Sequence, residues 1–307
     1  MKKWTVIIFI LGMLFPAVFT AIAPKQYSEP ESDYKDITEA PITICVLRNG
    51  EPTIMELGEY LVGVILKEIP RGFDMEAIKA QAVVSRTYAL KMIQQSSKHK
   101  SSVCTEADCC QGYIAPNEYI LQGGNGGFLS QVRQAVNDTK DLVITYNGEL
   151  IEATFFSCSG GRTEDAVAVW GTDIPYLQST LSPGEESAIY YTDTATFSAE
   201  DFCQKLGINK SASLVENVDY TEGGGVSTIR IGGKLFTGVQ IRKLMQLRST
   251  AFTIEQKGDS IIVSTKGFGH RVGMSQYGAD AMAAAGADFK QIICHYYKGV
   301  QVQKLNG

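Results

Sequence analysis

Two apolar helical segments separated by a proline constrain the fold of this chain more than any other feature. The spacing predicts one helix over residues 56–68 and a second over residues 74–96. A residue before proline is pushed out of the helical region, so the first helix should end near Glu68, ahead of Ile69-Pro70. Asp74 is a typical N-cap for the second helix. The sequence therefore places a carboxylate at the end of an apolar helix, beside a sharp break in the chain.

The rest of the body interleaves helices with antiparallel hairpins. Asn49-Gly50 and Asn147-Gly148 are strong hairpin turns between apolar stretches. Residues 99–127 and 182–196 are expected to be loops. Further strands are expected over 226–238 and 251–265, and short helices over 198–206, 239–245, 275–285 and 289–298. Because no strand–helix–strand rhythm is present, an α+β fold that forms a cleft fits better than a doubly wound sheet.

The N-terminus predicts export. Lys2 and Lys3 precede an apolar run over 4–23, and Ala21-Ile22-Ala23 resembles a signal-peptide cleavage site. The run is also long enough to cross the bilayer as a retained anchor, and the two lysines favour a cytoplasmic N-terminus. We favour the anchor, and a cleaved signal peptide is the alternative. The predicted organisation is a signal-anchor over 1–23, an acidic linker over 24–41 and an exported globular body over 42–303.

Composition excludes one class of partner. The 307 residues include 28 Lys and Arg against 33 Asp and Glu, for a formal net charge of −5. A mildly acidic chain without clusters of basic residues lacks the positive surface that phosphate backbones require, so nucleic acid is excluded as a partner.

Glu68 is the carboxylate that best suits chemistry. The negative end of the helix dipole and the apolar neighbours Ile65 and Ile69 both disfavour its ionised form. Both effects raise the pKa of the carboxyl, as a general acid working near neutral pH requires. The alternative is an ordinary solvated residue at a helix end, which is the more common case on spacing alone.

Several motifs in order resemble the stage II sporulation protein D family. The stretch LVGVILKEIPRGFDMEAIKAQAVVSRTYAL over 61–90 carries the family pattern of a helix ending in an acidic residue plus proline, then F-x-x-E-A-(L/I)-K-A-Q-A-x-x-x-R-T-Y. The other matching stretches are QGY at 111–113, residues 135–171, PYLQS at 175–179 and GFGHRVGMSQYGADAMAAAG at 267–286. The resemblance covers roughly residues 42–303.

The resemblance implies a peptidoglycan lytic transglycosylase, anchored in the mother-cell membrane during engulfment of the forespore. Glu68 would be the catalytic acid and then base: it protonates the oxygen between N-acetylmuramic acid and N-acetylglucosamine, and afterwards takes the proton of the C6 hydroxyl that closes a 1,6-anhydro ring. The implied substrate is glycan without stem peptides, and the implied partners are stage II sporulation proteins P and M. Two alternatives stay open: a non-catalytic wall-binding scaffold, and a two-carboxylate muramidase in which Glu164 or Asp165 meets Glu68 in space.

Residues for substrate binding are predicted from the glycine-rich and helical motifs. The candidates are Gln81, Arg86, Ser157, Ser159, His270, Ser275, Gln276 and Tyr277. Structural interpretations compete for several of them: Ser275 is a favoured N-cap, Tyr277 suits a core, and Gln81 and Arg86 suit a buried amide and an ion pair. The stretch at 267–286 lacks the ending of a phosphate-binding loop, which argues against a nucleotide. Covalent catalysis by Cys158 or a neighbouring serine, with His270 or His295 as base, is a further alternative.

A cluster of metal-binding residue types follows the second helix. His99, Cys104, Cys109 and Cys110 form the pattern H-x4-C-x4-C-C. Four nitrogen and sulfur ligands suffice for a tetrahedral structural zinc site, and some clostridial members of the resembled family carry a His/Cys zinc cluster in the corresponding loop. The competing interpretation is a disulfide, for example between Cys104 and either Cys109 or Cys110. We favour zinc.

Overall fold

The structure is a computed structural model that describes residues 41–96, 99–100, 102–209 and 215–305. Residues Pro41–Gly307 form a compact unit of their own. The membrane segment predicted over 1–23 and all but the last residue of the linker lie outside the described residues. Within the ranges that the structure describes, no helix is both long enough and apolar enough to cross a bilayer.

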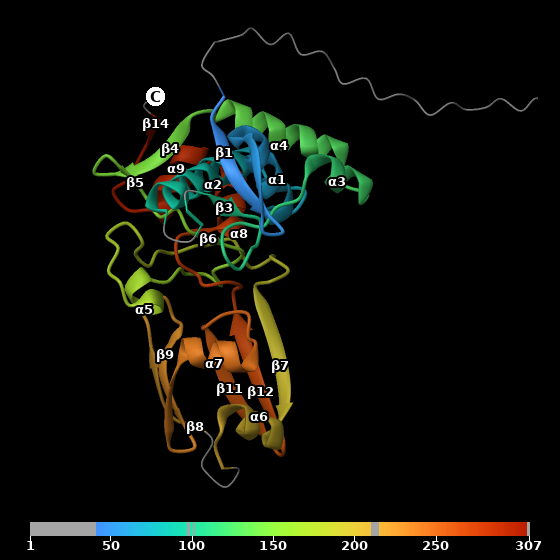
Figure 1. The fold of residues 1–307 in the computed structure, drawn as a ribbon. Coiled ribbons are helices and arrows are strands. Elements are labelled where there is room, and N and C mark those ends of the chain that lie inside the picture. Colours follow the sequence, from blue (N-terminus) through green and yellow to red (C-terminus); the bar gives the residue numbers. More distant parts are fainter. Residues whose placement is uncertain (1–40, 97–98, 101, 210–214, 306–307) are drawn as a thin grey trace, which may run out of the picture. The chain divides into compact units, whose positions relative to one another are not determined.

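The predicted pair of helices forms the centre of the first hydrophobic core (Figure 1). α1 spans Leu57–Glu68, and its end is followed by Ile69 in an extended conformation, as Pro70 requires. α2 spans Met75–Gln95, and the Asp74 carboxylate caps it by accepting from the Glu76 N–H. α2 packs against α1, α4 (Gly126–Asp138), α8 (Gln276–Ala284) and α9 (Phe289–Tyr296). Helices cover several of its sides, so its polar residues are buried as well.

Two small sheets flank these helices. Their strands are β1 (Thr43–Arg48), β2 (Glu51–Glu56) and β3 (Val103–Cys104) in the order β2-β1-β3, and β4 (Leu142–Tyr146), β5 (Glu149–Leu150) and β14 (Gln301–Lys304) in the order β14-β4-β5. The hairpins predicted at Asn49-Gly50 and Asn147-Gly148 are confirmed, because each joins an antiparallel pair of strands. All four turn residues have positive φ, which asparagine and glycine tolerate.

A second hydrophobic core is formed by buried residues between Ala199 and Val263, a segment that precedes α8 and α9 in the chain. One antiparallel sheet holds β7 (Thr192–Ser198), β11 (Phe252–Lys257) and β12 (Ser260–Lys266). The other holds β8 (Val215–Tyr220), β9 (Val226–Ile231) and β10 (Lys234–Thr237). α6 (Ala199–Leu206) and α7 (Gly238–Met245) pack against these sheets. The α+β class is therefore confirmed for the described residues.

Short elements link the two cores along the chain. They are β6 (Phe155–Phe156), which pairs in parallel with β13 (Met274–Ser275), and α5 (Ala166–Trp170). The parallel pair brings the loop after Phe156 alongside the start of α8. This brings parts of two of the matching stretches, 135–171 and 267–286, next to each other.

The structure differs from the sequence prediction in two loops. Residues 99–127 contain β3, α3 (Pro116–Leu121) and the start of α4, and residues 182–196 end in β7. α3 is a single short helix with little to bury, so it leaves no periodic signal in the sequence. α4 begins with Gly126-Gly127, which by propensity indicates a turn, but Asn125 caps the helix and its apolar face packs on α1 and α2.

Candidate active site

A cleft of about 750 Å³ contains the side chain of Glu68. Its walls come from both cores: Glu68 and Tyr88 belong to helices of the first, and Arg242 belongs to α7 of the second. Aromatic side chains contribute much of the lining, namely Phe155, Phe156, Trp170 and Phe268. Apolar ring faces combined with a few polar groups are typical of a site that binds a small molecule or a sugar.

Glu68 is held at the cleft wall by the motif QGY over 111–113. Its Oε1 accepts a hydrogen bond from the Gly112 N–H at 2.8 Å. A Cβ at position 112 would lie 2.9 Å from Oε1, so only glycine permits this close approach. Burial raises the pKa of the Glu68 carboxyl, and this outweighs the Gly112 N–H, the Gln276 amide and the Lys67 charge, which favour the anion. The predicted direction of the pKa shift is confirmed, with burial as its main cause.

Gln276, the first residue of α8, lines the same cleft as Glu68. Its side chain is 5% exposed, and Nε2 has no acceptor at hydrogen-bond distance among the described residues. It lies close enough to the Glu68 carboxyl to favour the anion. This amide is thus a donor beside the Glu68 carboxyl that can strengthen its contact when the carboxylate forms.

The preceding residue, Ser275, has a structural role. Its hydroxyl caps α8 by accepting from the Gly278 N–H, and the residue is fully buried. Ser275 was predicted to bind substrate, but it does not line the cleft. The N-cap interpretation is the one that the structure supports.

Glu185 fixes the loop and helix that carry these residues, and sequence reasoning missed it. Its buried carboxylate accepts from the Ser159 hydroxyl at 2.6 Å, the Gly160 N–H at 2.9 Å, the Ser182 hydroxyl at 2.8 Å and the Ser275 hydroxyl. A buried carboxylate needs such donors in place of water. Ser159 is thereby occupied below the surface, in contrast to its predicted role in substrate binding. Glu185 lies in a polar loop with no periodic pattern, so no sequence signal marked it.

His270 lines the cleft as a neutral imidazole. Burial lowers the pKa of His270 to about 4, with a further contribution from the nearby Arg242 charge. The Val272 N–H donates to Nδ1 at 3.1 Å, which leaves the proton on Nε2. Its ring packs against Trp170 and Phe156, with centroids 5.4 and 5.7 Å apart. His270 is thus suited to hydrogen bonding and ring packing rather than to carrying charge.

Three other predicted residues do not line the cleft. Gln81 donates to the Ser85 hydroxyl inside the first core. Arg86 is 3% exposed and donates to the carbonyls of Val136 and Leu142. Tyr277 packs edge-on against the Phe73 and Tyr190 rings. The structural interpretation is favoured for both: Gln81 is a buried amide, and Arg86 is a core residue whose partners are two carbonyls in place of the predicted ion pair.

The covalent alternative is disfavoured. Cys158 is fully buried and lies 3.5 Å from a Glu185 oxygen, and burial raises the pKa of its thiol to about 12. A thiol with that pKa is a poor nucleophile at neutral pH. The Nε2 atom of His295 contacts the Leu181 carbonyl, and His295 does not line the cleft. Ser157 lines the same cleft as His270 and Glu68, and its role in substrate binding stays a prediction.

Glu164 and Asp165 are also engaged outside the cleft. Glu164 forms a fully buried ion pair with Arg271 at 3.1 Å. Asp165 accepts from the Ser179 N–H at 2.8 Å. Neither lines the cleft with Glu68, whereas the carboxylates of Asp108 and Glu152 do. A two-carboxylate mechanism would therefore pair Glu68 with Asp108 or Glu152.

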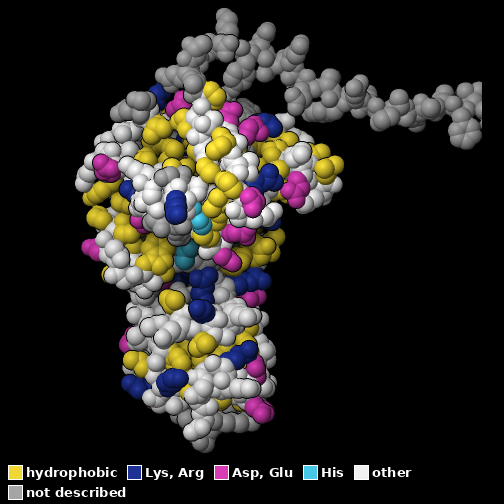
Figure 2. All heavy atoms as spheres, viewed as in Figure 1, with side chains coloured by type: hydrophobic (Ala, Val, Ile, Leu, Met, Phe, Trp, Pro, Cys, Tyr) yellow, Lys and Arg dark blue, Asp and Glu magenta, His cyan; other side chains and the backbone are white. Residues whose placement is uncertain are grey.

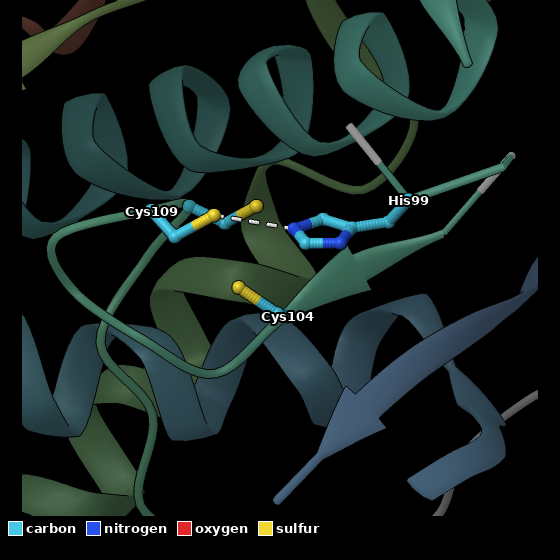
Figure 3. Close-up of side chains that lie close together, drawn as sticks. His99, Cys104 and Cys109 are labelled. Carbon is cyan, nitrogen blue, oxygen red and sulfur yellow. Dashed lines mark hydrogen bonds between the residues drawn. The ribbon is translucent and has the colours of Figure 1, made fainter. Parts of the chain in front are cut away.

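The predicted metal-binding residues are brought together. The ligand atoms of His99, Cys104, Cys109 and Cys110 all lie within 4.8 Å of one another. Figure 3 shows the His99 ring and the Cys104 and Cys109 thiols pointing toward one another, with His99 Nε2 3.2 Å from Cys109 Sγ. The described cysteines form no disulfide. Zinc–ligand bonds of about 2.0–2.3 Å need donors at such separations, so this donor set fits a tetrahedral zinc ion.

Comparisons with known proteins show that this chain is similar to stage II sporulation proteins. The family model described as "Stage II sporulation protein" matches residues 51–146, which include both central helices and the QGY segment. The chain is 37% identical over 296 residues to stage II sporulation protein D of Bacillus subtilis (strain 168), covering 94% of this chain and 85% of that protein. It is 36% identical over 279 residues to the Bacillus amyloliquefaciens protein of the same name, covering 88% and 81%.

The chain belongs to the stage II sporulation protein D family, as its motifs predicted. A more distant similarity is to the amidase enhancer of Bacillus subtilis (strain 168). It is 28% identical over 296 residues, which cover 78% of this chain and 39% of that protein.

Proposed function

We propose that this chain is a lytic transglycosylase that cuts the N-acetylmuramic acid–N-acetylglucosamine bond of stem-peptide-free glycan during engulfment. The observation that carries the proposal is the Glu68 carboxyl on the wall of an aromatic-lined cleft, where burial raises its pKa, the direction that a general acid requires. The family membership supports the sporulation context.

One carboxyl group suffices for this reaction. Protonated Glu68 donates its proton to the bridging oxygen as the bond to C1 of the muramic acid breaks. The Gly112 N–H and the Gln276 amide then stabilise the carboxylate that forms. That carboxylate takes the proton of the C6 hydroxyl as its oxygen attacks C1, which closes the 1,6-anhydro ring and restores the acid. An intramolecular nucleophile replaces the second carboxylate that a hydrolase needs.

The setting of the proposed reaction is the outer face of the mother-cell membrane. The apolar run over 4–23 would hold the body there by a single span, with stage II sporulation proteins P and M as partners. The similarity to an amidase enhancer is consistent with work beside an amidase.

A two-carboxylate muramidase is the second candidate. It is favoured by one observation, namely that Asp108 and Glu152 line the same cleft as Glu68. A wall-binding scaffold without activity is the third.

Product analysis separates the three functions. The purified full-length protein, in detergent, is incubated with glycan strands from which an amidase has removed the stem peptides, and the products are analysed by mass spectrometry. We expect products with 1,6-anhydro ends, which are lighter by one water than the reducing ends that a muramidase makes. Reducing ends would establish the hydrolase, and intact strands would establish the scaffold; either result contradicts the proposed function.

We further propose that the cluster of His99, Cys104, Cys109 and Cys110 holds a structural zinc ion. The metal would fix the loop that ends at Gly112, whose N–H binds Glu68. With four protein ligands the ion is closed to water, so its contribution would be folding energy rather than activation of a nucleophile.

Metal analysis tests the zinc site. We expect about one zinc ion per chain, and loss of that ion when Cys104 or Cys110 is replaced by serine. The matched control is Cys294→Ser, an exposed cysteine outside the cluster, which should leave the zinc content unchanged. Unchanged zinc in the cluster variants, or a disulfide found between cluster cysteines by mass spectrometry, would contradict the proposal.

A further inference from the structure

Arg242 is a cation without a counter-ion at the wall of the cleft. It is the one Lys or Arg that lines the cleft among the described residues. Its Nε donates weakly to the Leu247 carbonyl at 3.4 Å, and no described carboxylate lies within ion-pair distance of its guanidinium. Burial is the cause of the lowered pKa of Arg242, with no contribution from a nearby carboxylate. An unpaired and partly buried guanidinium is costly unless a ligand supplies the anion.

The neighbouring charged groups leave Arg242 available. Arg248 forms an ion pair with Asp193 at 3.2 Å and stacks over the Tyr190 ring and over that of Phe268, which lines the cleft. His270 is neutral and contributes no charge of its own. Figure 2 shows Lys and Arg side chains gathered next to a histidine on this face. Arg242 is therefore the cation in the cleft lining that an entering anion can pair with.

The fold holds Arg242 at this place. It lies in α7, where Ile241 and Met245 are buried in the second core. Thr237 and Gln240 form a capping box that fixes the start of the helix. A guanidinium on a rigid helix binds a carboxylate with two parallel hydrogen bonds at little entropic cost.

Removal of a stem peptide creates such an anion. Each muramic acid carries a lactyl group that is joined to the peptide by an amide, and hydrolysis of that amide leaves a lactyl carboxylate on the sugar. We propose that Arg242 binds this lactyl carboxylate and so determines the specificity of the cleft for peptide-free glycan. The inference rests on the proposed function for its substrate, but it concerns binding and not the cleavage step.

The proposal gives a role to Arg242, which takes no part in the proton transfers of Glu68. Asp108 and Glu152 line the cleft together with Glu68, and their carboxylates would repel an anionic strand. A single cation placed in the lining orients such a strand by its lactyl group. A muramic acid whose lactyl group is still an amide offers no negative charge at that point, so Arg242 would stay unpaired.

Binding measurements in the Glu68→Gln background test the proposal without cleavage. The ligands are fluorescently labelled strands in three forms: free lactyl carboxylates, the same groups converted to methyl amides, and intact stem peptides. We expect the free form to bind about 10- to 100-fold more tightly than the methyl amide form. Arg242→Met should reduce this ratio to near one and leave binding of the methyl amide form unchanged. Arg242→Lys, which keeps the charge without the planar fork, should give an intermediate ratio.

The matched control is Lys243→Met, which removes the same charge from the exposed neighbouring position and should keep the full ratio. A ratio retained in Arg242→Met, or a ratio of one before substitution, would overturn the assignment. The assignment would also be overturned if Arg242→Met weakened the binding only of strands with intact stem peptides, because a peptide carboxylate would then be the ligand. If the Glu68→Gln variant shows the expected binding ratios while the wild-type protein yields no anhydro ends, the proposed function fails and this inference stands. If thermal melting shows that Arg242→Met is already unfolded at the temperature of the binding assay, the ratio measured with Arg242→Lys decides instead.

Discussion

Glu68→Gln should lower the rate of glycan cleavage by about 100- to 10,000-fold, because an amide cannot donate the proton that the bridging oxygen needs. The substitution is nearly isosteric, and the glutamine carbonyl still accepts from the Gly112 N–H. The measurement is the rate of release of anhydro-ended products from peptide-free strands by the purified protein.

The fold should survive this substitution. The pKa of the Glu68 carboxyl is raised in the folded state, so the folded state holds its proton more tightly than the unfolded chain does. The group's contribution to the free energy of unfolding is therefore fully present below the unfolded pKa and falls as the pH rises toward the folded pKa. At neutral pH, Glu68→Gln should melt at the wild-type temperature or above it.

Glu59→Gln is the control for this prediction. Glu59 lies on the same helix, but its side chain is exposed and pairs with Arg133. Its replacement should leave cleavage unchanged. Near wild-type cleavage by Glu68→Gln, with Glu59→Gln equally active, would remove Glu68 from the mechanism.

The pH profile gives an independent measure of the same group. The reaction needs protonated Glu68 at its first step, so cleavage should persist below the raised pKa and decline as the pH rises through it. A rate that falls instead as the pH drops from neutral toward 5 would contradict a general acid at this position.

The parts of the fold that follow from local signals were predictable. Pro70 ends α1, Asp74 caps α2, and the two Asn-Gly pairs form hairpin turns, because each effect acts within a few residues. α4 was missed because Gly126-Gly127 indicates a turn, and only packing against α1 and α2 overrides that preference.

The candidate site was predictable only where chemistry and local structure coincide. Glu68 combines a helix end with apolar neighbours, and both can be seen in the sequence. Arg86 was a candidate for substrate binding with a structural interpretation beside it. Helices cover several sides of α2 and bury this residue in the core. Arg242 and Glu185 carried no signal, because their surroundings are created by contacts with residues far away in the chain.

Arg271→Met should lower the free energy of unfolding by about 3–5 kcal/mol, because it leaves the fully buried Glu164 carboxylate without its cation. The guanidinium also donates to the carbonyls of Ser159 at 2.7 Å and Gly223 at 2.6 Å. Gly223 lies in the turn between β8 and β9, so one side chain connects the second core to the loop behind the cleft. The expected fall in melting temperature is roughly 6–20 °C.

Two further variants show whether the unpaired charge is the cause. Arg133→Met breaks the ion pair with Glu59, in which both side chains are about half exposed, and should cost less than about 1 kcal/mol. The double variant Arg271→Met/Glu164→Gln should be more stable than Arg271→Met alone, since it removes the buried charge that the single substitution strands. A double variant that is less stable than the single one would show that Arg271 acts through its carbonyl contacts. The ion pair would then contribute little to holding the turn at Gly223 against the cleft loop.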